Sequence, residues 1–329
     1  MKTSIRTLRM WIVGVSILAA TGIVSSCSKK SSGTTTPPPP VGPTNPGGYD
    51  SSEQIQTSAL LDYWTFNGNL TDSKGALSAT NDGATFSTGM LSGTQAFQGS
   101  STGYAVITNP GSSLPAMQSF TISVWINSAQ IAKGGPEESF FQLVDSTQWQ
   151  SNIHLGVIPA TSTDSLTLGV KLQNWPGDTV IPWQTYYLNA YLDTAVGKWT
   201  HVVVTYSGSS SILNVYENGT VIPVNGPYTS YPGYTGLELF QNDPGTPPTG
   251  GTPNSNPNSA KPWGNVTFKY ATGIAFGAWS VNTVPPLSDN GTEPWAGNYL
   301  GEMEHLRIYN TALSASDVKS LYILEQAGF

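Results

Sequence analysis

Oxygen-bearing side chains gather in one turn that follows the first apolar segment after the N-terminal region. Asn67, Asn69 and Asp72 lie together there, with Gly68 between the first two. Ca²⁺ takes about six to eight oxygen ligands from carboxylates, amides and main-chain carbonyls, and such a turn can supply several of them. The same residue types are also common in turns that hold no metal. The turn therefore predicts either a calcium site or a simple chain reversal.

Glu304 is a second acidic residue whose surroundings matter. It lies in an alternating segment near the C-terminus, where we expect Leu306 and Ile308 on the inward face of a strand. The spacing places Glu304 on the same face, and an unpaired buried carboxylate is very costly. We expect its partner to be a calcium ion or, alternatively, Arg307 or His305.

Aromatic rings and amide groups occur together in the middle of the chain. Sugars present flat C–H faces that stack on aromatic rings, and their hydroxyl groups bond to amide and carboxyl groups. The alternative is that these rings pack long loops onto the body of the protein. The expected ligand-binding residues are Trp149, Asn174, Trp175, Trp183, Tyr186 and Tyr187.

Acidic pairs suited to glycoside hydrolysis are scarce. Retaining glycosidases place two carboxyl groups about 5–5.5 Å apart. Glu302 and Glu304 are two residues apart and share a strand face, but no third acid follows them, whereas Glu137 and Glu138 are adjacent and point to opposite faces. The sequence shows no phosphate-binding loop, zinc spacing or nucleophile elbow. We assign no catalytic residue and favour a non-enzymatic role.

The N-terminal residues predict an exported, lipid-anchored protein. Residues 1–26 have a basic start and an apolar run too short to span a bilayer, which is typical of a signal peptide. Cys27, the only cysteine, follows two small residues and resembles the lipidated cysteine of bacterial lipoproteins. Residues 27–58 are rich in Ser, Thr, Pro and Gly and predict a flexible tether. We therefore expect attachment to the bacterial envelope, at the outer membrane.

The charge of the chain argues against nucleic acid as a partner. The formal net charge is −7, and removal of the three basic residues in 1–26 takes it to −10. An acidic surface repels phosphate backbones and anionic lipid headgroups. Contact with a membrane is expected only through the lipid on Cys27.

Residues 59–329 predict one all-β domain with a short closing helix. Charged residues make up only 10% of the chain, and turn formers separate many short alternating segments. Asn218-Gly219 predicts a tight hairpin, and Ser314 with Asp317 predicts a helix N-terminus. The expected strands are 60–66, 104–107, 120–127, 140–144, 153–157, 166–172, 199–206, 212–217, 221–224, 266–270, 274–278 and 300–309.

Six motifs in order carry a resemblance to a known family. Together they resemble the laminin-G-like domains of the concanavalin A-like lectin/glucanase superfamily. The resemblance implies a jelly-roll sandwich of two curved antiparallel sheets. The motifs are LDYWTFNGNLTDS at 61–73, QAFQG at 95–99, SFTISVW at 119–125, KWTHVVVTY at 198–206, VYENG at 215–219, and the closing stretch 301–322.

The resemblance also has implications for ligands. It implies a ligand-facing concave sheet or loop rim, and a structural calcium where the opening strand meets the closing strand. That meeting point would bring Glu304 to the turn containing Asp72, although family members usually carry Asp at the positions of Asn67 and Glu304. We expect a tethered, non-catalytic module that binds extracellular glycan or glycoprotein. A glycoside hydrolase or polysaccharide lyase on the same fold, or a protein-binding adhesion domain, are the alternatives.

Overall fold

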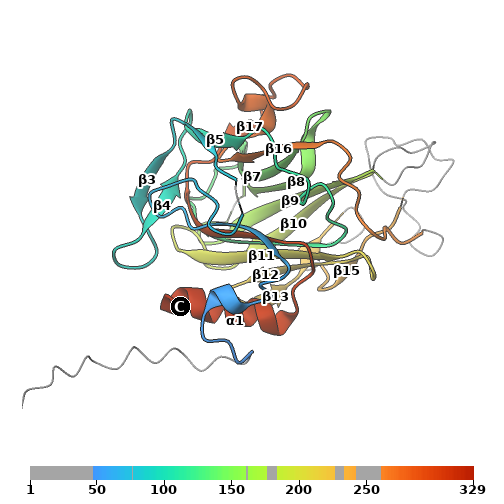
Figure 1. Cartoon of the computed structure of the whole chain (residues 1–329). Coiled ribbons are helices and arrows are strands. Elements are labelled where there is room, and N and C mark those ends of the chain that lie inside the picture. The colour runs from blue at the N-terminus through green and yellow to red at the C-terminus, as the bar shows by residue number, and fades with distance from the viewer. Residues whose placement is uncertain (1–46, 76, 161, 176–183, 227–232, 242–260) are drawn as a thin grey trace, which may run out of the picture. The chain divides into compact units, whose positions relative to one another are not determined.

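Two antiparallel sheets pack face to face to form a sandwich (Figure 1). The structure is a computed structural model that describes residues 47–75, 77–160, 162–175, 184–226, 233–241 and 261–329. Apart from β17, which runs parallel to β7, the paired strands of both sheets are antiparallel. The predicted all-β, two-sheet antiparallel jelly-roll fold with a C-terminal helix is confirmed.

The first sheet contains the opening and closing strands of the domain. Strand β1 lies beside β18, and β15 lies beside β12. In order across the sheet the other strands run β13-β12-β11-β6-β18-β4-β3. Their bounds are β1 (Leu60–Trp64), β3 (Thr85–Thr88), β4 (Gln95–Gln98), β6 (Phe120–Asn127), β11 (Thr200–Ser207), β12 (Ile212–Glu217), β13 (Thr220–Ile222), β15 (Leu237–Glu238) and β18 (Glu302–Tyr309).

The second sheet carries the surface on which the candidate site is built. Its strands run in the order β14-β10-β9-β8-β7-β16-β5-β2, with β17 beside β7. Their bounds are β2 (Thr80–Asp82), β5 (Tyr104–Ile107), β7 (Glu137–Asp145), β8 (Gln148–Ile158), β9 (Leu166–Asn174), β10 (Gln184–Leu192), β14 (Val224–Asn225), β16 (Ala271–Phe276) and β17 (Ala296–Asn298).

The core lies between the sheets and follows from alternation along each strand. On β6, Phe120, Ile122, Val124 and Ile126 all belong to the core, as a period of two requires. Trp125 points to the opposite face of the same sheet, where it contacts Tyr322 of the C-terminal helix. One strand therefore supplies both the core and the bed of the helix.

The C-terminal helix α1 (Ala315–Ala327) begins and ends where its sequence predicts. The Ser314 hydroxyl accepts the Asp317 N–H, and Gly328 takes a left-handed conformation with φ 79° at the C-terminus. Val318, Leu321 and Leu324 are buried in a second apolar cluster against the outer face of the first sheet. The predicted closing helix is confirmed.

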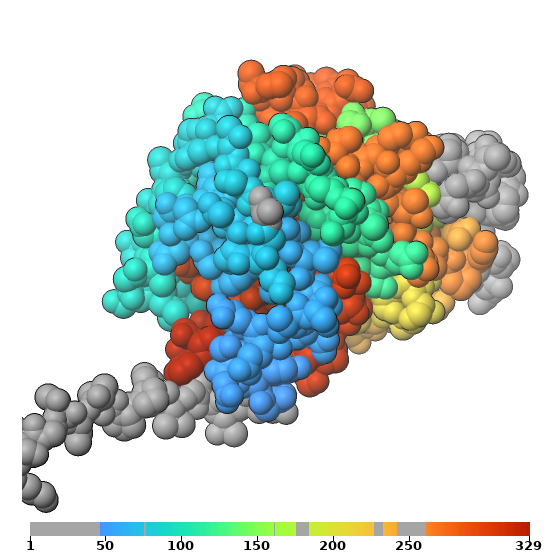
Figure 2. Space-filling model, in the orientation of Figure 1, coloured from blue at the N-terminus to red at the C-terminus, as the bar shows by residue number. Residues whose placement is uncertain are grey.

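The chain enters the fold earlier than its composition suggests. Residues 49–58 fall within the predicted tether, yet the 3₁₀ helix η1 (Ser52–Gln54) and Ile55 contact the C-terminal helix or its cluster. The Ser52 N–H donates to the Phe329 carbonyl. Figure 2 shows these first residues, in blue, beside the C-terminal residues, in red. Among the helices described, none is long and apolar enough to cross a membrane.

Glu304 does not share the inward face with Leu306 and Ile308, so that prediction is wrong. His305 has a φ of 51°, and the pairing of β18 with β6 shifts register between Glu304 and Arg307. A bulge of this kind inserts one residue and reverses the alternation. Met303 therefore joins the core, while Glu304 pairs with Trp125 on the helix-facing side.

Several segments differ from the predicted strands, among them the short strands β2, β3, β4, β15 and β17, which the sequence does not predict. Residues 266–270 form no strand, although Val266 and Phe268 lie in the core as side chains of a loop. Strand β10 is one of the longest in the second sheet, yet the sequence does not predict it. Polar residues such as Gln184, Thr185 and Asn189 dilute its apolar pattern, and only pairing with β9 makes the strand regular.

Candidate functional site

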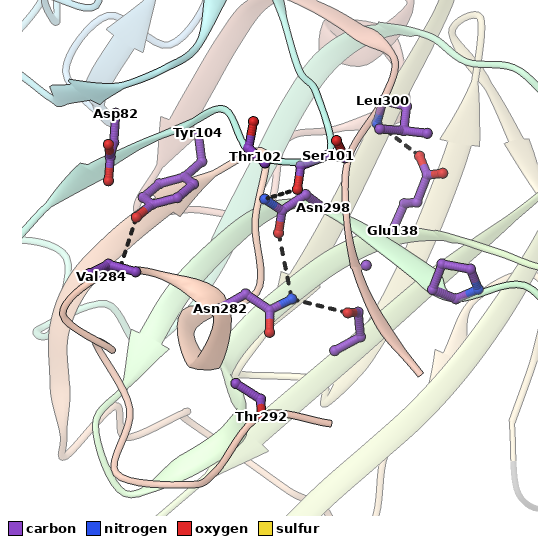
Figure 3. Close-up of a pocket in the computed structure, with 13 residues that line it drawn as sticks. Asp82, Ser101, Thr102, Tyr104, Glu138, Asn282, Val284, Thr292, Asn298 and Leu300 are labelled. Carbon is purple, nitrogen blue, oxygen red and sulfur yellow. Dashed lines mark hydrogen bonds between the residues drawn. The ribbon is translucent and has the colours of Figure 1, made fainter. Parts of the chain in front are cut away.

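A pocket of about 790 Å³ opens at the rim of the second sheet. We call it the rim pocket and define it by Asp82, Tyr104, Glu138, Asn282, Asn298 and Leu300 (Figure 3). These residues come from β2, β5, β7, the 3₁₀ helix η2 (Ser280–Asn282), β17 and the loop after it. Ligand pockets commonly have volumes of about 300–1,000 Å³, so the space suits a small molecule or one or two sugar rings.

The parallel strand β17 forms one wall of the rim pocket. It pairs with β7 so that Ala296 lies opposite Glu137 and Asn298 opposite Ser139. Gly297 passes so close to Pro136 that a Cβ at this position would lie 2.8 Å from the proline ring, which favours glycine there. The wall is therefore fixed by backbone pairing and close approach.

Side-chain amides tie the walls of the rim pocket together. Asn298 Nδ2 donates to the Ser101 carbonyl at 3.3 Å. Asn282 Nδ2 donates to the Ala296 carbonyl at 3.0 Å and reaches Asn298 Oδ1 at 3.5 Å. Figure 3 shows this chain of hydrogen bonds running from the β5 side to η2. The amides thus hold η2 and β17 in place beside the pocket.

Two carboxyl groups lie on opposite sides of the pocket in Figure 3. Glu138 is 6% exposed, its Oε2 accepts the Leu300 N–H at 2.9 Å, and burial raises its pKa. On the other side, the Tyr104 hydroxyl accepts the Val284 N–H at 2.8 Å, and burial together with the nearby Asp82 raises the pKa of this tyrosine. None of the described residues that line the pocket is a lysine, arginine or histidine. The described lining of the pocket therefore carries acidic side chains and no basic one.

Apolar side chains flank the mouth of the rim pocket. Val284 is 80% exposed and Leu300 is 52% exposed. Both line the pocket, and a large exposed apolar residue beside convergent polar groups is a recurring feature of ligand sites. The sequence does not reveal this site because its residues come from segments spread between positions 82 and 300.

The candidate calcium ligands each have protein partners. Asn67 Oδ1 accepts the Gln95 N–H at 2.9 Å, and Asn69 Oδ1 accepts the Thr71 N–H at 3.0 Å. Asp72 Oδ1 accepts the Tyr63 and Lys74 N–H groups, at 2.7 and 2.9 Å. These are the hydrogen bonds of a well-formed turn.

Glu304 is held by a different part of the chain. Its Oε2 accepts the Met90 N–H at 2.8 Å, and burial raises its pKa. Arg307, one of its expected partners, pairs with Glu325 instead, and His305 contacts the Tyr63 hydroxyl. Within the described residues no group of three or more His, Cys, Asp or Glu side chains is arranged to hold a metal. Calcium at Asn67, Asn69, Asp72 and Glu304 stays a prediction.

Asp72 has an acidic neighbour that the sequence does not reveal. The Asp62 carboxyl group is within hydrogen-bonding reach of Asp72, and both residues are almost fully buried. Burial and the Asp72 charge raise the pKa of Asp62 to about 7. Asp62 lies in β1, and its contact with the turn depends on how the chain folds back after that strand.

Two of the predicted ligand-binding aromatics come together on the outer face of the second sheet. The Trp149 ring lies 6.0 Å from Tyr187 and 4.7 Å from Trp295, measured between ring centroids. Trp279 packs beneath them and is fully buried. Trp149, Tyr187 and Trp295 keep partly exposed surfaces, so they form a small aromatic platform on this face.

The other predicted ligand-binding residues lie elsewhere. Tyr186 is in the core beside Trp263, and Asn174 is buried with its Oδ1 accepting the Thr267 N–H. Trp175 donates to Asp145 Oδ2 at 2.8 Å and packs edge-on against Tyr270. Tyr186 and Asn174 are inaccessible to a surface ligand because each side chain points inward from its own strand, β10 and β9 respectively. Trp183 falls outside the described residues.

Glu137 and Glu138 point to opposite sides of β7, as their adjacency predicts. Glu138 lines the rim pocket, whereas Glu137 pairs with Lys171 on the outer face of the sheet. His154 lies 3.7 Å from Glu137 and stacks on Trp279 with 4.0 Å between the ring centroids. Because Trp279 covers this charged group, His154 and Lys171 are closed off from a surface ligand.

The fold and the pocket define a β-sandwich domain with a candidate small-ligand pocket at its rim. Residues 97–251 match the family model Laminin_G_3, described as the concanavalin A-like lectin/glucanases superfamily, which confirms the resemblance drawn from the motifs. No curated protein matches the chain.

Several solved structures resemble the chain in fold. Domain 4 of AbnA, a GH43 extracellular arabinanase from Geobacillus stearothermophilus solved in complex with arabinotriose, is 17% identical with a TM-score of 0.44, covering 80% of this chain and 97% of that one. The binding domain of botulinum neurotoxin DC, in complex with rat synaptotagmin II, is 15% identical with a TM-score of 0.48. That match covers 80% of this chain but about half of the neurotoxin chain, 51%. Such distant likeness concerns the fold alone.

Proposed function

We propose that the protein is a non-catalytic module that binds extracellular glycan in the rim pocket. The observation that carries this proposal is the pocket itself, which combines amide, hydroxyl and carboxyl groups with apolar side chains at its mouth. Sugars require this mixture, because they present hydroxyl groups around the ring edge and C–H groups on its faces. The aromatic platform on the same sheet offers a second place for a longer chain to stack.

A binding role is favoured over catalysis by the arrangement of the acids. Asp82, the other acid of the pocket, is exposed to solvent, and Glu137 pairs with Lys171 away from the pocket. Glu302 accepts a hydrogen bond from Asn127, and Glu304 from Met90. A hydrolase needs two carboxyl groups that flank one glycosidic bond, and the charged group that contains His154 lies beneath Trp279. Protein adhesion remains the second candidate.

We also propose that the module is held at the bacterial outer membrane by lipid on Cys27. The signal peptide at 1–26 and the lipobox-like cysteine support this. Cys27 lies outside the described residues. A lipid anchor contributes about 0.8 kcal/mol for each buried methylene, so mass spectrometry of the N-terminal peptide and membrane fractionation of Cys27→Ser test the anchor directly.

A glycan array probed with the full-length chain in detergent tests the proposed function. We expect binding to a subset of glycans, and loss of that binding in Asn298→Ala with a circular dichroism spectrum like that of the parent. Asn214→Ala, which alters a partly exposed asparagine on β12 of the other sheet, is the matched control. If a folded chain binds no glycan, the proposed glycan binding is wrong and protein adhesion becomes the favoured function.

The same array with added Ca²⁺ or EDTA tests the calcium prediction separately. Binding that EDTA abolishes and Ca²⁺ restores would support a metal at Asn67, Asn69, Asp72 and Glu304. Thermal unfolding with and without Ca²⁺ distinguishes a structural ion from none, because a ligand that binds only the folded state raises Tm.

A further inference from the structure

We propose that the rim pocket recognises amino sugars through Asp82 and Glu138 and rejects glycans that carry acid groups. This inference rests on the proposed function and names the chemical class of its ligand. It is carried by the charge of the pocket lining and by the position of Glu138.

The pocket has acidic side chains and no basic one among the described residues that line it. A ligand bearing carboxylate or sulfate groups would meet Asp82 on one side and Glu138 on the other, without a cation to offset the repulsion. A like charge brought beside the nearly buried Glu138 discriminates against a ligand, whereas the solvent-exposed Asp82 contributes less. An ammonium group on the ligand would instead be attracted by the carboxyl groups of Asp82 and Glu138.

Glu138 is placed to receive such a group. Glu138 is only 6% exposed, and its Oε2 accepts the Leu300 N–H at 2.9 Å. A carboxylate can accept about four hydrogen bonds, so one backbone donor leaves most of that capacity for a ligand. Burial raises the pKa of Glu138 and the Leu300 N–H lowers it, with burial the larger effect. An ammonium donor would supply the missing counter-charge.

The rest of the pocket fits the sugar that carries the amine. Asn282 and Asn298 offer amide groups, and Thr292 and Ser101 offer hydroxyl groups. Val284 and Leu300 at the mouth can contact the C–H face of a ring. The Tyr104 hydroxyl accepts the Val284 N–H and so holds this residue of the mouth in place, on the side of the pocket where Asp82 lies.

Isothermal titration of the full-length chain with three tetrasaccharides tests the inference. Chitosan tetramer and its N-acetylated form share one backbone and differ only in the free amines, and oligogalacturonate supplies the acidic case. We expect chitosan to bind about tenfold to a hundredfold more tightly than the acetylated form, as for hydrogen bonds between charged groups. No binding of oligogalacturonate is expected.

Glu138→Gln is the informative variant, since it removes the charge and keeps an oxygen to accept the Leu300 N–H. We expect it to remove most of the preference for chitosan over the acetylated form. Glu238→Gln, which removes an exposed acid on β15 of the other sheet, is the matched control and should change neither affinity. Thermal unfolding of each variant verifies that it is folded.

The outcomes separate this inference from the proposed function. Equal or tighter binding of the acetylated or acidic tetramer would overturn the inference and leave the glycan-binding function standing. Binding of none of them, nor of any glycan on the array, would overturn both. Equal binding of tetralysine, sensitive to Glu138→Gln, would show that the pocket recognises amines without the sugar and would overturn the inference.

Discussion

The two sheets of the sandwich differ in how their outer faces are completed. The outer face of the first sheet is sealed by α1 and η1, and Arg307, buried on that face, finds its partners there. Arg307 Nε lies 2.7 Å from Glu325 Oε1, and Trp125 donates to Glu325 Oε2 at 2.8 Å. The rim of the second sheet instead leaves Glu138 beside an open pocket with one backbone donor.

The difference shows that paired buried charges stabilise the first sheet, whereas the rim of the second sheet keeps a carboxyl group with unused hydrogen-bond acceptors. A buried ion pair with hydrogen bonds holds the chain ends to the first sheet, since Arg307 also donates to Ser52 at 3.0 Å. A buried acid without a cation costs stability. Glu138 is such a group, and the glycan site proposed above uses it.

The largest expected effect is on the sealed face. Arg307→Ala leaves Glu325 buried without its cation and should lower the free energy of unfolding by about 3–5 kcal/mol. Denaturant unfolding followed by tryptophan fluorescence measures it. The double variant Arg307→Met/Glu325→Leu replaces the pair by apolar groups and should recover most of the loss. A loss below about 1 kcal/mol in Arg307→Ala would mean that the pair does not hold this face.

Two buried glutamates should respond to pH in opposite ways. Burial raises the pKa of Glu325, but Arg307 and nearby histidines outweigh it, and the net pKa is lowered. Its stabilising contribution is therefore present above the unfolded-state pKa and is lost as pH falls through the folded-state value. The pKa of Glu138 is raised, so its ionisation costs stability as pH rises from the unfolded-state value to the folded-state value.

Variants make that contrast measurable at neutral pH. Glu325→Gln should lower Tm, whereas Glu138→Gln should leave it unchanged or raise it by about 1–2 °C. Unfolding of both variants and the parent between pH 4 and pH 7, by differential scanning fluorimetry, gives the comparison, with the range set around the ordinary glutamate pKa of about 4.3. A fall in Tm for both variants would contradict the distinction between the two faces.

The pocket wall gives a smaller effect on stability and a larger one on binding. Asn282→Ala removes the amide that joins η2 to β17. We expect a loss of about 1–2 kcal/mol of stability, the range for a side chain that satisfies buried backbone groups, and at least tenfold weaker glycan binding. Titration calorimetry and denaturant unfolding measure the two. Unchanged glycan affinity would place the site elsewhere on the molecule.

The smallest expected change comes from the pocket mouth. Val284→Ser alters a side chain that is 80% exposed, so stability should stay within about 0.5 kcal/mol. If this residue contacts the sugar ring, glycan affinity should fall severalfold. Val221→Ser, on a strand of the first sheet and 36% exposed, provides a control that should leave affinity unchanged.

Local pattern predicted much of the fold. The alternation of β6 and the cap of α1 at Ser314 depend on neighbouring residues only, and both are confirmed. Local alternation predicts the wrong face for Glu304 because the bulge at His305 arises from pairing with β6, which a local pattern does not encode. Strand β10 is not predicted for a related reason, since its regular conformation depends on pairing with β9.

The candidate site depended almost entirely on tertiary structure. The sequence by itself determined an acidic, all-β chain with a signal-like N-terminus, strand faces of fixed polarity and a capped closing helix, because composition and short-range periodicity specify these. Only the tertiary structure brought Asp82, Glu138 and Asn298 to one pocket, and moved Tyr186 into the core. Contacts between residues far apart in the chain are set by sheet order and register, which no local window of sequence contains.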